Sequence, residues 1–104
     1  MELTNLETMP GRRITRHLGL VQGSTVRAKH AGRDFLAGLK NIVGGELKAY
    51  TELLNESRQE AVDRMVAQAK AAGANAVVNI RFSTANIAAG AAEVMAYGTA
   101  VVVE

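Results

Sequence analysis

The longest periodic stretch of the chain, residues 46–72, predicts one long helix. Its apolar side chains recur at three- and four-residue spacing and form a seam of Leu47, Tyr50, Leu54, Ala61, Met65, Ala69 and Ala72. Gly73 follows as the expected C-cap. At 1.5 Å per residue this helix would span roughly 40 Å, which is long beside the radius of gyration of about 13 Å for a compact domain of 100 residues. The length and the wide apolar band therefore predict a partner subunit.

Three other stretches have the alternating pattern of strands. Residues 12–27 and 75–84 predict two of them, and residues 93–103 predict a third that is apolar on both faces. An Ala/Gly-rich connection is expected at residues 85–92. In the second strand the even positions are expected to pack on the long helix: Ala76, Val78, Ile80 and Phe82. Because a two-sided apolar strand needs a cover on each face, we expect another subunit to supply the second cover.

A short amphipathic segment, residues 31–45, precedes the long helix. Its apolar residues form one helical stripe of Phe35, Leu36, Leu39, Ile42 and Val43. A segment of this length does not hold a helix alone, so it must pack against something. Together with the last strand it is expected to make subunit contacts. The elements as a whole predict an α+β fold in which an antiparallel sheet packs on one long helix.

Composition limits the function classes. The 104 residues fit a single domain, residues 1–104, with 48% hydrophobic and 4% aromatic residues. The absence of cysteine excludes disulfides, thiolate nucleophiles and Cys-based metal sites. No stretch reaches the ~18 apolar residues of a membrane span, and the N-terminus does not resemble a signal peptide. These features predict a cytoplasmic protein with no membrane partner.

Several motifs resemble the YbjQ-like family of small bacterial proteins, which is labelled as heavy-metal-binding and has no settled function. They are HLGLVQG, RDFLAGLKNIVGGELKAY, GANAVVNIRF and YGTAVVV. The resemblance covers nearly the whole chain. It implies a dodecin-like subunit that forms a ring, most simply a homopentamer. Many relatives carry a cysteine where this chain has Leu18, so a soft-metal site built on that thiolate is excluded here.

Metal binding is the first candidate chemistry. The imidazoles are His17, on the polar face of a strand, and His30, in a loop. Their spacing matches no known ligand motif. A ring could bring copies of one histidine together around a divalent ion, and the alternative is two ordinary surface or interface histidines.

Binding of a small anion is the second candidate. Arg33 and Asp34 precede the short apolar segment, and Gly44 and Gly45 precede the long helix. A helix N-terminus beside free backbone amides can accept a phosphate or carboxylate. The alternative is a sharp glycine turn, with Arg33 held in an ion pair.

The sequence carries no motif for catalysis. The carboxylates of the long helix lack partners at catalytic spacing, and the nucleophile, phosphate-loop and HExxH patterns are missing. The net charge of +2, without aromatic residues between the basic ones, argues against nucleic acid as a partner. The sequence thus predicts a homo-oligomeric binding or scaffolding protein that is not an enzyme. Binding of a metal or a small anion at subunit interfaces is the alternative.

Overall fold

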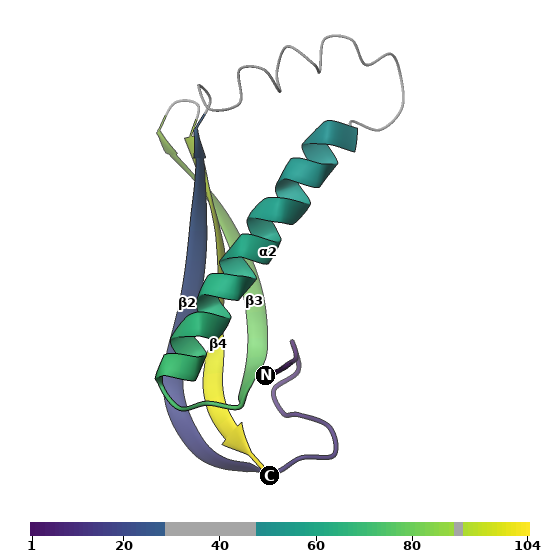
Figure 1. Cartoon of the computed structure of the whole chain (residues 1–104), viewed down its shortest axis with the longest axis vertical. Helices are drawn as coiled ribbons and strands as arrows, with labels where there is room; N and C mark the ends of the chain where they lie inside the picture. Colours follow the sequence, from purple (N-terminus) through teal and green to yellow (C-terminus); the bar gives the residue numbers. More distant parts are fainter. Residues whose placement is uncertain (29–47, 89–90) are drawn as a thin grey trace.

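The fold is a four-stranded sheet with a helix across one face (Figure 1). The computed structural model describes residues 1–28, 48–88 and 91–104. The elements are β1 (Glu2–Leu3), β2 (Ile14–Ala28), α2 (Lys48–Ala71), β3 (Ala76–Ala88) and β4 (Ala91–Val103). The strand order is β1-β3-β4-β2. β4 pairs antiparallel with β2 and β3, but β1 pairs parallel with β3. The α+β prediction is confirmed, while the sheet is mixed rather than wholly antiparallel.

Part of the predicted seam forms the main core, but Ala72 is exposed just after the end of α2, so the prediction that it belongs to the seam was wrong. Ala61, Met65 and Ala69 are fully buried, and they pack with residues of all three long strands. The helix ends as predicted, because Gly73 has a positive φ of 90° and the backbone N–H of Ala74 donates to the Ala69 carbonyl at 3.0 Å. The predicted segment 31–45 lies outside the described residues.

The helix lies mainly over β2 and β4 and touches β3 little. Gly23 of β2 permits this position, because a Cβ there would collide with the backbone of Ala61 and Met65. Side chains of the helix also bind the outer backbone of β2. The Gln22 N–H donates to Oε1 of Gln68 at 2.7 Å, and Arg64 donates to the Ser24 carbonyl. The sheet is thus covered asymmetrically.

The alternation of β3 changes phase at Asn79. Ala76 and Val78 point away from α2, so the prediction that they face the helix was wrong. Val77 lies in the core against α2 instead. Asn79 has a φ of 57°, and the register with β4 shifts between Val78 and Arg81, which marks a β-bulge. Beyond the bulge Ile80 packs against the core under α2, as predicted.

The N-terminal segment that precedes β2 covers the face of the sheet that points away from α2, near the C-terminal end of β4. Met9 is buried there in a second cluster with Ala76, Val78, Val101 and Val103. The expectation that another subunit covers this face of the last strand is therefore wrong for Val101 and Val103. The predicted connection 85–92 is also shorter than expected, because β3 continues to Ala88 and β4 begins at Ala91.

Candidate interaction site

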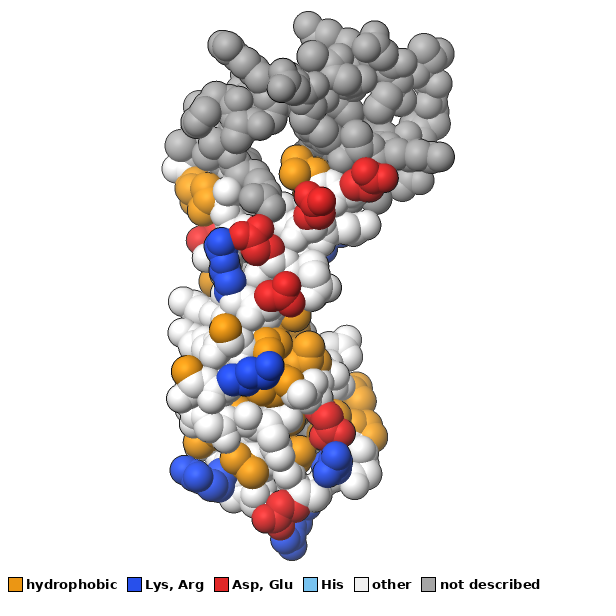
Figure 2. Space-filling model, in the orientation of Figure 1, with side chains coloured by type: hydrophobic (Ala, Val, Ile, Leu, Met, Phe, Trp, Pro, Cys, Tyr) orange, Lys and Arg blue, Asp and Glu red, His pale blue; other side chains and the backbone are white. Residues whose placement is uncertain are grey.

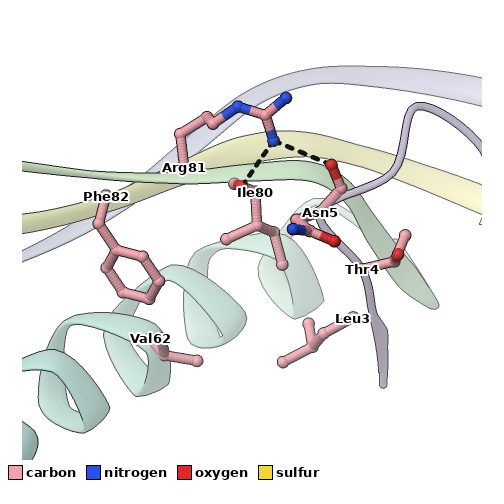
Figure 3. Close-up of a pocket in the computed structure, with 7 residues that line it drawn as sticks. All are labelled: Leu3, Thr4, Asn5, Val62, Ile80, Arg81 and Phe82. Atoms are coloured by element: carbon pink, nitrogen blue, oxygen red, sulfur yellow. Dashed lines mark hydrogen bonds between the residues drawn. The ribbon is translucent and has the colours of Figure 1, made fainter.

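A hollow of about 530 Å³ lies beside the helix, on the side where the sheet is uncovered. We call it the β3 groove. Its lining consists of Leu3, Thr4, Asn5, Val62, Ile80, Arg81 and Phe82. Figure 3 shows the side chains of Leu3, Val62, Ile80 and Phe82 turned toward one space, while Arg81 points to the opposite side of the strand.

The groove exists because α2 is displaced toward β2. Val62 is on the flank of the helix that faces β3, and Ile80 and Phe82 are on the strand below it. No described element closes the space between them, so the Phe82 side chain remains 51% exposed. A phenylalanine on the helix side of a sheet would normally be buried. The groove is therefore an exposed apolar surface, of the kind that marks a binding site for a partner.

The N-terminal segment builds the lower wall of the groove. The Thr4 N–H donates to the Val77 carbonyl at 3.1 Å, and the Ile80 N–H donates to the Thr4 carbonyl at 3.1 Å. Nη1 of Arg81 donates to the Asn5 carbonyl at 2.9 Å. These contacts hold Leu3 at the edge of β3, where its side chain stays 42% exposed.

The two outer edges of the sheet differ. On β2, side chains of α2 bind the backbone at Gln22 and Ser24. On β3, residues 81–88 pair with β4 alone, and no described backbone group bonds to their outer side. An unpaired strand edge invites contact with another chain. The free edge and the apolar groove are on the same side of the molecule.

A second surface with exposed apolar side chains lies on the face of the sheet that points away from α2, where it also carries the polar residues Gln22, Ser24, Glu93 and Thr99. We call it the open face and define it by Leu20, Val26, Met95 and Tyr97. These residues share a face because Leu20 pairs with Thr99 and Val26 with Glu93, in phase with Met95 and Tyr97. Leu20 is 71% exposed and Val26 52% exposed, while Met95 and Tyr97 are half-buried.

Charge is distributed unevenly around these surfaces. α2 carries four acidic residues, Glu52, Glu56, Glu60 and Asp63. Figure 2 shows acidic side chains in red along the helix side of the molecule. Glu60 pairs with Arg64, the i,i+4 pair that the sequence predicts. Among the described residues, Glu52, Glu56 and Asp63 form no ion pair. The solvent-exposed side of α2 is therefore acidic.

The structure describes one of the six candidate site residues from the sequence. His17 is exposed on β2 and pairs in register with Val101, so it belongs to the side of the open face. Within the described ranges, no three His, Cys, Asp or Glu residues gather as a metal site would require. His30, Arg33, Asp34, Gly44 and Gly45 lie outside the described residues. Leu18 packs partly buried against the main core.

Sequence reasoning missed the groove and the open face as surfaces. Phe82 was expected to be buried under the helix, and Leu20 was expected only on one face of a strand. The available signal was Phe82 itself, since a single narrow helix rarely covers both edges of a sheet. The displacement of the helix toward β2 depends on Gly23, which the sequence marks only as a break in the strand.

Comparison with known proteins fixes the family. A family model described as "Putative heavy-metal-binding", YbjQ, matches residues 1–104. The chain belongs to the YbjQ family. A UPF0145 protein of Hahella chejuensis is 64% identical over 104 residues, which is 100% of both chains. A UPF0145 protein of Acinetobacter baylyi is 70% identical over 96 residues, covering 92% of this chain and 89% of the relative.

The YbjQ family extends beyond bacteria, which corrects the bacterial scope expected from the resemblance. A relative from the archaeon Archaeoglobus fulgidus is 60% identical over 99 residues, covering 95% of this chain and 92% of the relative. The fold also matches a crystal structure from Pediococcus pentosaceus with a TM-score of 0.63 and 15% identity, covering 100% of this chain and 98% of the other. That protein is described as having unknown function, so the likeness concerns the fold alone. None of the described helical residues form a stretch long and apolar enough to cross a membrane.

Proposed function

We propose that this YbjQ-family chain is a self-assembling binding or scaffolding protein that performs no catalysis, with the cytoplasm as its compartment. The observation that supports self-assembly is the β3 groove. It leaves Phe82 51% exposed beside a free strand edge. Apolar surfaces of this kind on a small domain mark sites of association. Two features of the sequence also support self-assembly. They are the apolar stripe of residues 31–45 and the resemblance to a family whose subunits are expected to form a ring of five.

In the described part of the chain, the charged side chains that form ion pairs connect segments of the fold to one another. Glu2 pairs with Arg12 at 3.0 Å and Glu104 with Arg13 at 3.3 Å, and each pair joins the N-terminal segment to a neighbouring strand or chain end. Glu60 holds Arg64 where Arg64 also binds the β2 backbone. These pairs link segments of the fold, and as exposed pairs each contributes about 1 kcal/mol or less.

The second candidate function is binding of a divalent metal or a small anion between subunits. It is favoured by the place of His17, which is exposed beside the open face rather than fixed in the core. If the open face contacts another copy, His17 comes to the subunit boundary, where copies of one imidazole could share an ion. Arg33, Asp34, Gly44, Gly45 and His30 remain proposed members of such a site.

Native mass spectrometry tests both functions on one sample. We expect freshly purified protein at micromolar concentration to give an assembly of five chains of 11.0 kDa each, in neutral volatile buffer. A second spectrum, recorded after addition of Zn²⁺, reports stoichiometric metal. Denaturation of the same sample then releases any small molecule that copurified.

The controls separate the two candidates. His17→Ala should keep the assembly and lose the added Zn²⁺, whereas Arg16→Ala, one residue away, should keep both. A monomeric wild type would refute self-assembly. Equal Zn²⁺ uptake by wild type and His17→Ala would remove His17 from the metal site.

A further inference from the structure

We draw no further inference here: the strongest candidate, the β3 groove beside the outer edge of strand β3, exposes Phe82 to solvent, but nothing in the structure shows what covers it.

Discussion

Replacing Gly23 by alanine is expected to destabilise the protein by about 3 kcal/mol or more. The new Cβ would collide with the Ala61 carbonyl oxygen and the Met65 backbone nitrogen of α2. These are backbone atoms, so a change of rotamer cannot relieve the contact, and the helix itself must move.

Urea denaturation at matched protein concentration measures this loss. Gln22→Ala, on the adjacent residue of the same strand, is the control, because the described contact of Gln22 with α2 uses its backbone N–H. We expect the control to stay within about 1 kcal/mol of wild type. A Gly23→Ala midpoint equal to that of the control would show that α2 does not approach β2 so closely. The stated origin of the groove would then be wrong.

Met65→Ala is expected to cost about 2–5 kcal/mol. Met65 has no exposed surface and is the largest fully buried side chain of the core between α2 and the sheet. Its removal leaves a cavity between elements whose backbones are already in close contact, so little collapse can fill the space. Thermal and urea unfolding at fixed concentration provide the measurement.

The matched variant is Met65→Leu, which conserves most of the volume and should cost less than about 1.5 kcal/mol. Equal stabilities for the alanine and leucine variants would contradict the burial of this residue.

The helix was the part of the fold that the sequence predicted best. Ala61, Met65 and Ala69 recur at four-residue spacing, and that spacing alone puts them on the buried face. The cap at Gly73 followed from the same reasoning, since glycine adopts positive φ without strain. These are local properties of the chain, and no knowledge of distant contacts was needed.

The strands were harder to predict because one residue reversed a pattern that appeared regular. Asn79 interrupts an unbroken alternation of apolar and polar residues, and its positive φ shifts every later side chain by one position. Asparagine tolerates this conformation better than most residues, but nothing in the spacing indicated a bulge. The parallel β1 strand has two residues and no periodicity to detect.

The candidate site could not be predicted because it depends on how far the helix is displaced across the sheet. That displacement depends on contacts between residues far apart in sequence, such as Gly23 with Met65. The residues chosen from the sequence were selected for their chemistry, and the structure places His17 exposed, without a metal-ligand cluster in the described ranges. The surface that supports the proposed self-assembly is apolar instead, and it exposes Phe82.

Sedimentation equilibrium of the wild-type chain tests the proposed self-assembly most directly. At micromolar concentration we expect a mass several times the 11.0 kDa of one chain. Phe82→Lys, which puts a charge into the exposed apolar groove, should shift the protein toward the monomer. A wild type that sediments at 11.0 kDa over the whole concentration range would contradict the proposal.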